Sequence, residues 1–256
     1  MLLEINHIYK NFQGVEAVSD FSLSSEAGEI HGIIGPNGAG KTTIFNVISG
    51  VYPPVKGSII LDGKDISKLP QYKRTKAGIG RTFQNIRLFK GLTCMENVLC
   101  AFDPESKYNF FEGILPLPRR YKEEKRGREE CLKSLKAVGM EEYKDENPEN
   151  LAYGLQRRLE IARALACKPK VLLLDEPAAG LNPTEVSQLT ELIKRLSVEY
   201  GFAVLLIEHR LELVMSISKD IHVVNFGQTI AVGTPKEIQQ NPEVIKAYLG
   251  EEEKHD

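Results

Sequence analysis

Gly35-Pro36-Asn37-Gly38-Ala39-Gly40-Lys41-Thr42 connects a strand-like apolar run (29–34) to a helix-like run (41–48). It fits the phosphate-binding pattern G-x-x-x-x-G-K-[ST]. The glycines let backbone N–H groups turn toward an anion, and the following helix adds the positive end of its dipole. Lys41 supplies a point charge for the outer phosphates, and the Thr42 hydroxyl is placed to ligate Mg²⁺. Together with the neighbouring Thr43, the stretch predicts a nucleoside triphosphate site.

The composition is ordinary for a globular protein, since 42% of the 256 residues are hydrophobic and 27% are charged. The formal net charge of −2 leaves no basic excess, so we expect no nucleic-acid partner. The longest apolar runs, 171–174 and 202–207, are far shorter than the roughly 20 residues that span a bilayer. Residues 1–6 lack the features of a signal peptide, and the four cysteines form no C-x-x-C pair, which favours reduced thiols.

The order of apolar runs predicts an α/β fold with a largely parallel sheet. Continuous apolar runs at 171–174 and 203–207 are typical of parallel strands buried on both faces, and helix-like segments separate them. An N-terminal antiparallel β layer is expected beside the phosphate-loop strand, from short strand-like runs at 3–9, 21–23 and 58–61.

The middle of the chain differs in composition. Prolines punctuate a loop-rich stretch at 104–118, and a charged segment with apolar residues at helical spacing follows, including Cys131, Leu135 and Val138. We therefore expect one domain over 1–256, in which 86–158 is a mostly helical insert. The segments on either side, 1–85 and 159–256, form the expected catalytic lobe.

Two carboxylates, Asp175 and Glu176, end the apolar run 171–174. At the carboxyl end of a parallel strand they reach the crevice where ligands bind. Asp175 can hold Mg²⁺ beside the phosphates, and Glu176 can take a proton from an attacking water. Solvated acids at a strand end are the alternative interpretation, which the phosphate loop makes much the weaker one.

Two further polar residues stand at the ends of expected strands. Gln84 follows the strand-like run 79–83, where its amide can contact Mg²⁺ or the attacking water. His209 follows the run ending at Ile207, where it can donate to a γ-phosphate. A surface glutamine and a structural histidine are the open alternatives, and the structural interpretation is the only one given to the remaining histidines, His7, His31, His222 and His255.

A second anion-facing segment, Leu151-Ala152-Tyr153-Gly154, comes just before a helix-like run at 155–166. One chain thus carries two phosphate-facing surfaces and a single phosphate-loop lysine. A head-to-tail pair of subunits, each completing the other's site around two nucleotides, accounts for both surfaces. An ordinary glycine before a helix is the alternative.

In chain order these motifs resemble those of the ATP-binding subunits of ABC transporters, over essentially the whole chain. The matching segments are Walker A (35–42), the Q-loop (Gln84), the signature (151–155), Walker B (171–176), the D-loop (179–182) and the H-loop (His209). The resemblance implies a P-loop NTPase of ABC type that sandwiches ATP and Mg²⁺ between two subunits. It places Lys41, Glu176 and His209 in catalysis, Thr42, Gln84 and Asp175 at the metal, and Leu151 to Gly154 in trans. Phe12 falls where that family stacks an aromatic ring on adenine.

The wording of the segments 81–85, 175–183 and 241–250 resembles one branch, the LivG-type subunits of branched-chain amino-acid uptake systems. That resemblance implies a peripheral importer ATPase on the cytoplasmic face of the inner membrane. Its implied partners are a second ATP-binding subunit, two transmembrane permeases and an extracytoplasmic solute-binding protein.

Other interpretations remain open. The solute can be another small polar molecule such as urea, and the chain can be a soluble ABC ATPase or a nucleotide-gated module with little turnover. A nucleic-acid-repair ATPase is disfavoured because the expected long coiled-coil insertion is absent from this sequence.

Two positions depart from the family pattern. Leu155 replaces the glutamine of the general signature, and loss of that amide weakens the contact in trans by about 0.5–1.5 kcal/mol. Arg210 follows His209 where the branch usually has aspartate, so the local charge is reversed.

Overall fold

The computed structural model describes residues 1–102 and 118–252. The loop-rich stretch expected at 104–118 lies, apart from its last residue, outside the described residues, as does His255. The chain forms two compact units, one made of Met1–Gln84 and Pro169–Asp256 and the other of Asn85–Lys168. The first unit holds the sheet and the phosphate loop, and the second is helical.

A mixed sheet runs through the first unit in the order β5-β4-β1-β2-β10-β9-β3-β8-β7-β6. Its strands are β1 (Leu3–Phe12), β2 (Val15–Ser25), β3 (Ile30–Ile34), β4 (Lys56–Leu61), β5 (Lys64–Asp65), β6 (Ile79–Arg81), β7 (Val171–Asp175), β8 (Ala203–Ile207), β9 (Asp220–Asn225) and β10 (Gln228–Gly233). The neighbours β9, β3, β8, β7 and β6 are parallel, whereas β1 pairs antiparallel with both β2 and β4. The predicted parallel core and N-terminal antiparallel layer are confirmed.

Parallel pairing gathers the ends of distant segments at one edge. Within the sheet His31 pairs with Leu205 and Leu172 pairs with Val204, so β3, β7 and β8 point the same way in close register. The residues that follow these three strands therefore meet at the carboxyl edge, which is where ligands bind in such sheets.

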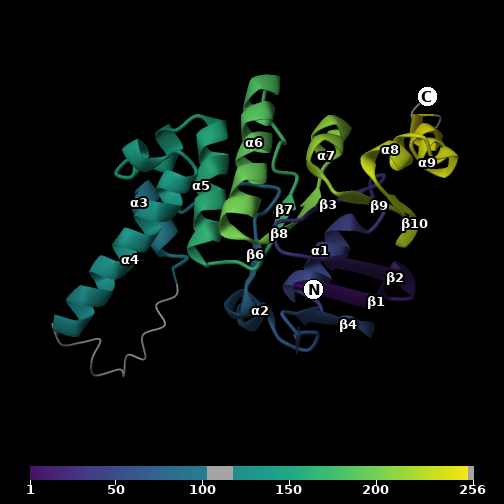
Figure 1. Cartoon of the computed structure of the whole chain (residues 1–256), viewed down its shortest axis with the longest axis horizontal. Helices are drawn as coiled ribbons and strands as arrows, with labels where there is room; N and C mark the ends of the chain where they lie inside the picture. Colours follow the sequence, from purple (N-terminus) through teal and green to yellow (C-terminus); the bar gives the residue numbers. More distant parts are fainter. Residues whose placement is uncertain (103–117, 253–256) are drawn as a thin grey trace. The chain divides into compact units, whose positions relative to one another are not determined.

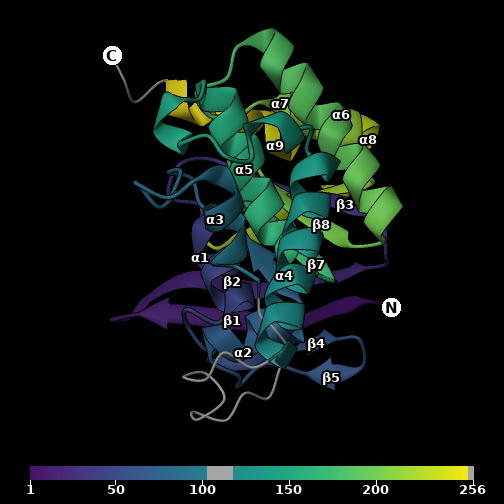
Figure 2. The ribbon, with the colours of Figure 1, turned by 90° about the vertical axis from the view of Figure 1, so that its left-hand side faces the viewer.

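The helix α1 (Lys41–Ser49) anchors the phosphate loop in the core of the first unit. Its side chains Ile44, Phe45, Val47 and Ile48 are fully buried. Figures 1 and 2 show α1 on the side of the parallel strands that faces β1 and β2, with α6 (Pro183–Tyr200) and α7 (Leu211–Ile217) on the other side. Since each buried large apolar side chain contributes about 1.5–3 kcal/mol, the helix that carries Lys41 is firmly held.

Helix starts in this unit follow the capping signals in the sequence. Asn182 accepts the N–H of Glu185 at the start of α6, and Thr234 accepts the N–H of Glu237 at the start of α8 (Pro235–Gln239). Each helix has proline at its first position, which is pre-organised for that place. The other helices of the unit are α2 (Gln71–Ala77) and α9 (Pro242–Glu252).

The second unit packs three helices: α3 (Cys94–Leu99), α4 (Pro118–Ala137) and α5 (Tyr153–Ala166). Cys131, Leu135 and Val138 are buried, as their helical spacing predicts. The unit ends at Lys168 and not at the expected residue 158, because α5 is one continuous helix that packs on α3 and α4. Among the described residues, no helix combines the length and the apolar character that crossing a bilayer requires.

Candidate nucleotide site

Two glycines of the phosphate loop leave no room for a side chain. Gly35 has a φ of 151° and Gly40 a φ of 103°. A Cβ on Gly35 would lie 1.9 Å from the carbonyl oxygen of Val224, and one on Gly40 would lie 2.3 Å from that of Ala17. Strands β9 and β2 thus press against the backbone of the loop, so glycine is required at both positions.

Lys41 is buried at the first position of α1. Its Nζ donates to the carbonyl oxygens of Gly35 and Pro36, the latter at 2.8 Å. A buried ammonium at a helix N-terminus supplies the positive potential that a phosphate group needs. Thr42 and Thr43 follow on the first turn, exposed and half-buried respectively. The loop therefore has the conformation and charge expected of residues 35–43.

Asp175 is a buried carboxylate with an arginine partner. Its Oδ2 lies 3.0 Å from Nη2 of Arg81, whose Nη1 donates to Asn46 Oδ1 at 2.7 Å and to Ser49 Oγ at 3.0 Å on α1. Burial raises the pKa of Asp175, and Arg81 opposes that rise. The functional interest of Arg81 was missed from the sequence. The signal was a charged residue inside a short strand, β6, that pairs with β7.

The oxygen donors at this edge fit Mg²⁺, which prefers carboxylate and hydroxyl ligands. Asp175 brings a carboxylate, and Arg81 links that carboxylate to α1, one turn beyond the Thr42 hydroxyl. Gln84 bonds to Glu176 through its amide nitrogen, and the ligand role of its amide oxygen stays a prediction. Asp175, Thr42 and Gln84 are the residues that would hold the ion.

Glu176, His209 and Gln84 form one hydrogen-bonded group. Glu176 Oε1 lies 2.9 Å from His209 Nε2, and Glu176 Oε2 accepts from Gln84 Nε2 at 2.8 Å. Glu176 follows β7, His209 follows β8 and Gln84 follows β6. In sequence, His209 is 33 positions from Glu176 and Gln84 is 92 positions from it. Glu176 has a φ of 48°, a left-handed conformation that costs energy in a non-glycine residue and is common at functional sites. The structure thus brings together three residues that the sequence suggested separately.

Phe12 ends β1 with its ring 38% exposed. Tyr52 meets it edge-on, with ring centroids 5.1 Å apart, and the ammonium of Lys10 lies 5.1 Å from its centroid. The half-exposed ring is available for stacking, and the neighbouring aromatic and cation fix its place.

In the helical unit, Leu151-Ala152-Tyr153-Gly154 starts α5. Ala152 is the residue before the helix and its side chain makes no capping hydrogen bond. Tyr153 is exposed, and Leu155 is half-buried on the first turn. The N-terminus of α5 thus carries its dipole without a side-chain cap, and its role as an anion-binding segment stays a prediction.

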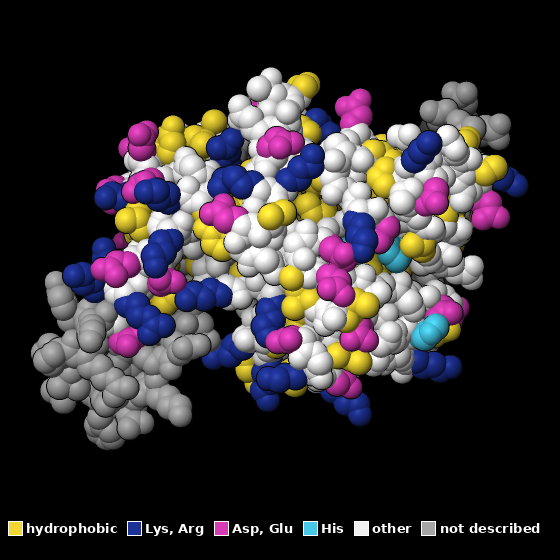
Figure 3. All heavy atoms as spheres, in the orientation of Figure 1, with side chains coloured by type: hydrophobic (Ala, Val, Ile, Leu, Met, Phe, Trp, Pro, Cys, Tyr) yellow, Lys and Arg dark blue, Asp and Glu magenta, His cyan; other side chains and the backbone are white. Residues whose placement is uncertain are grey.

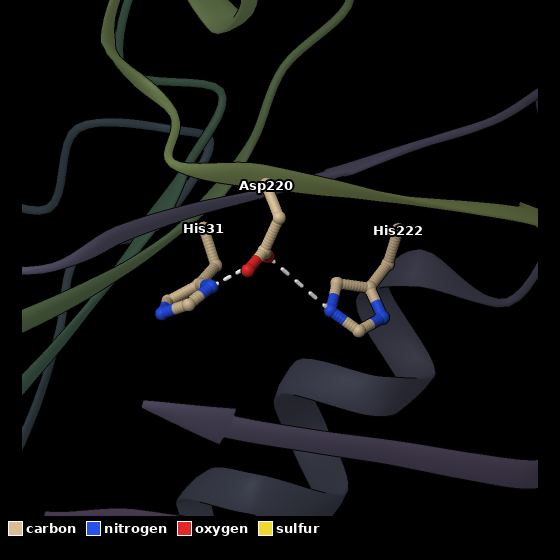
Figure 4. A group of neighbouring side chains, drawn as sticks. All are labelled: His31, Asp220 and His222. Carbon is tan, nitrogen blue, oxygen red and sulfur yellow. Dashed lines mark hydrogen bonds and ion pairs between the residues drawn. The ribbon is translucent and has the colours of Figure 1, made fainter. Parts of the chain in front are cut away.

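A second group of histidine and carboxylate side chains, His31, Asp220 and His222, lies elsewhere in the first unit (Figure 4). His31 Nδ1 is 2.6 Å from Asp220 Oδ1 and His222 Nε2 is 3.5 Å from the same oxygen, while His31 Nε2 reaches Ser25 Oγ at 2.8 Å. Two ligands of a tetrahedral zinc ion lie about 3.3 Å apart when each is about 2.0 Å from the metal. The 2.6 Å contact is therefore a hydrogen bond, which favours the structural interpretation of these histidines. Nδ1 of His222 is buried and has no hydrogen-bond partner among the described residues.

That network changes the acidity of Asp220. Burial alone would raise its pKa, but hydrogen bonds from His222 and His31 outweigh burial and hold the pKa far below its usual range.

On the surface, Figure 3 shows Lys and Arg side chains interspersed with Asp and Glu over the described residues of the visible face.

Comparison with known proteins agrees with this geometry. A family model described as "ABC transporter" matches residues 18–179, and one described as "Branched-chain amino acid ATP-binding cassette transporter" matches residues 228–254. The chain is 47% identical over 250 residues to the high-affinity branched-chain amino acid transport ATP-binding protein BraF of Pseudomonas aeruginosa, and 45% identical to LivG of Salmonella typhimurium, with 98% of each chain covered. It is 34% identical over 251 residues to the lipopolysaccharide export system ATP-binding protein LptB of Haemophilus influenzae, again covering 98% of each.

Solved structures are similar over nearly the whole chain. The ATP-binding cassette MJ1267 of an ABC transporter superposes with a TM-score of 0.83 at 32% identity, covering 96% of this chain and 98% of that one. The cassette MJ0796, dimeric in a post-hydrolysis state with ADP and phosphate, superposes with a TM-score of 0.74 at 25% identity, covering 91% and 99%. The chain therefore belongs to the ABC transporter family, as an ATP-binding cassette with ATPase activity.

Proposed function

We propose that this chain hydrolyses ATP to drive the import of branched-chain amino acids through separate permease subunits. The hydrogen-bonded group of Glu176, His209 and Gln84 is the observation that carries the hydrolytic role. The choice of solute is supported by BraF and LivG, which are 44–47% identical over 98% of the chain, and by the family model that matches the C-terminal segment.

The chain's own groups divide the reaction among them. The loop at 35–42 and Lys41 hold the β- and γ-phosphates, and Phe12 stacks on the adenine. Glu176 accepts a proton from the water whose oxygen attacks the γ-phosphorus. The bond between the γ-phosphorus and the oxygen that stays with ADP then breaks. His209, which is bonded to Glu176, donates to the transferring phosphoryl group and keeps the carboxylate in place. Asp175, Thr42 and Gln84 would hold Mg²⁺, which would neutralise charge on the phosphates.

The site is completed by a second subunit. Leu151 to Gly154 at the start of α5 face the nucleotide of a partner, and the dimeric state of the related cassette MJ0796 supports this arrangement. The expected assembly has two ATP-binding subunits on the cytoplasmic face of the inner membrane, two permeases and an extracytoplasmic solute-binding protein. The partner is a second copy of this chain or a related cassette.

The substitution Glu176→Gln tests the hydrolytic role. Because it keeps the shape of the side chain and removes the base, we expect kcat to fall by about 10²–10⁴-fold, with ATP affinity changed less than about threefold. Glu199→Gln, which alters an exposed carboxylate paired with Arg195, is the control and is expected to leave kcat unchanged. Hydrolysis at the wild-type rate in Glu176→Gln would remove Glu176 as the base.

Reconstitution with the proposed permeases and solute-binding protein tests the solute. We expect leucine, isoleucine and valine to stimulate ATP hydrolysis and to be taken up, and urea to do neither. Stimulation of ATP hydrolysis by urea alone would favour a urea importer. A full rate of ATP hydrolysis without any permease would favour a soluble ABC ATPase.

A further inference from the structure

Glu208 is a buried carboxylate between the end of β8 and His209, and its side chain has no role in the mechanism above. The residue is only 3% exposed. Burial raises its pKa, and hydrogen bonds from three backbone N–H groups oppose that rise. A buried carboxylate costs free energy unless hydrogen-bond donors satisfy it. The N–H donors around Glu208 therefore identify the backbone segments that its carboxylate binds.

The two oxygens of Glu208 bind two different segments. Oε1 accepts the N–H of Ala178 at 2.6 Å, two residues beyond Glu176. Oε2 accepts the N–H of His209 at 3.0 Å and that of Arg210 at 3.3 Å. One side chain therefore connects the backbone that carries Glu176 to the backbone that carries His209, through bonds that a charged acceptor strengthens.

Arg210 makes a second connection between the same segments. Its Nη2 donates to the carbonyl oxygen of Leu181 at 2.8 Å. The segment 178–181 is thus bound at both ends by the two residues that flank His209. The Arg210 side chain therefore has a defined partner in this segment.

The geometry of Glu176 requires such support. Its backbone is left-handed, with a φ of 48°, and its carboxylate must stay 2.9 Å from His209. Strained conformations persist only where the surrounding structure holds them, and a 1 Å misplacement of a reacting group costs about 100-fold in rate.

We propose that Glu208 is a positioning residue for hydrolysis, which fixes the spacing of Glu176 and His209 through the backbone, and that Arg210 reinforces it. The inference rests on the proposed roles of Glu176 and His209. A merely structural carboxylate would affect stability and leave the rate of the folded protein unchanged, so the two possibilities separate in kcat.

The test compares steady-state ATP hydrolysis, ATP affinity and thermal stability of the full chain in five variants, of which Glu208→Gln is the first. Glu208→Gln keeps one acceptor and replaces the other oxygen by a donor, so one of the two segments loses its bond. We expect kcat to fall by about 10- to 100-fold while KM and ATP affinity change less than about twofold. Glu29→Gln is the control, since Glu29 is a partly buried carboxylate, bonded to Lys219, before the amino end of β3, and its kcat is expected to match the wild type.

Two further variants change Arg210, whose side chain is exposed. They therefore test the proposal without altering a buried side chain. We expect Arg210→Ala to lower kcat by about two- to fivefold, and Arg210→Lys, which can still donate to Leu181, to restore most of it. This pair carries the test if Glu208→Gln does not fold.

Wild-type kcat in folded Glu208→Gln would overturn the proposal, as would equal losses of kcat in Glu208→Gln and Glu29→Gln. With Glu208→Gln unfolded, unchanged kcat in Arg210→Ala would also overturn it. Glu176→Gln measured alongside separates the two proposals. If it too remains active, the proposed role of Glu176 as the base fails, and if it alone is inactive, only the positioning role of Glu208 fails.

Discussion

His209 bonds to Glu176 beyond the carboxyl ends of β8 and β7, whereas His31 bonds to Asp220 at the amino ends of β3 and β9. Both are short contacts between an imidazole and a carboxylate, at 2.9 and 2.6 Å, in the same sheet. The side chain of His209 is 45% exposed, and that of His31 is 1% exposed with partners on both ring nitrogens.

The difference shows that the surroundings of a histidine–carboxylate pair decide what it does. At the carboxyl edge the pair lies beside the phosphate loop, open to solvent, and its carboxylate also bonds to Gln84. At the amino edge His31 also bonds to Ser25, Asp220 also contacts His222, and the ring of His222 packs against Phe21. We expect substitutions at the first pair to change the reaction and substitutions at the second to change stability.

Among the histidine–carboxylate pairs, the largest effect is expected for His209→Ala. Loss of a donor to the transferring phosphoryl group should lower kcat by about 10²–10³-fold. Because the side chain is half exposed, the melting temperature should change little. Steady-state ATP hydrolysis and thermal unfolding measure both quantities, and a large loss of stability with a small loss of kcat would erase the distinction between the two pairs.

His31→Ala should give the opposite result. The substitution opens a cavity and leaves Asp220 with fewer partners, so the free energy of unfolding should fall by about 2–4 kcal/mol. The folded protein should keep its KM and most of its kcat. Urea unfolding, together with kcat measured well below the melting temperature, checks this, and a lost kcat at wild-type stability would contradict it.

Asp220→Asn should make the free energy of unfolding less dependent on pH below about pH 4. The hydrogen-bonded carboxylate has a folded-state pKa below its unfolded value, so its contribution is complete above about pH 3.9 and is lost as the pH falls below that. We expect a deficit of about 1–3 kcal/mol at pH 7 that narrows toward pH 3. Urea unfolding at both pH values tests the sign, and a deficit that grows with acid would contradict the account.

The smallest effect is expected at a third pair, His7 and Asp20. Their contact is also 2.6 Å, but the side chains are 75% and 54% exposed. His7→Asn, which tolerates the left-handed backbone at this position, should change the free energy of unfolding by less than about 0.5 kcal/mol and leave kcat unchanged. A change comparable to that of His31→Ala would show that exposure does not rank these pairs.

Local patterns in the sequence were enough for the phosphate loop and for Asp175-Glu176, because the residues that act together there are adjacent in the chain. Gln84 and His209 were ambiguous, since a surface glutamine and a structural histidine fit the same sequence. Their contacts with Glu176 depend on strand order in the sheet, which places residues 92 and 33 positions apart side by side.

The contacts of Arg81 and Glu208 were out of reach for the same reason. Arg81 meets Asp175 across 94 positions, and Glu208 meets Ala178 across 30. Nothing in either residue's neighbours along the chain indicates these partners. The helix α5, by contrast, was predicted in type. It begins at Tyr153, two residues before the predicted start, and its assignment to a unit differed.

A double-substitution cycle in kcat tests most directly that Glu176 and His209 act as one unit. The full chain is measured as wild type, Glu176→Gln, His209→Ala and both together, with ATP affinity determined for each. We expect the double variant to fall no more than about threefold below the slower single variant, because groups that act together are not additive. A double variant whose loss equals the product of the two single losses would show that the two residues act independently and would contradict the account.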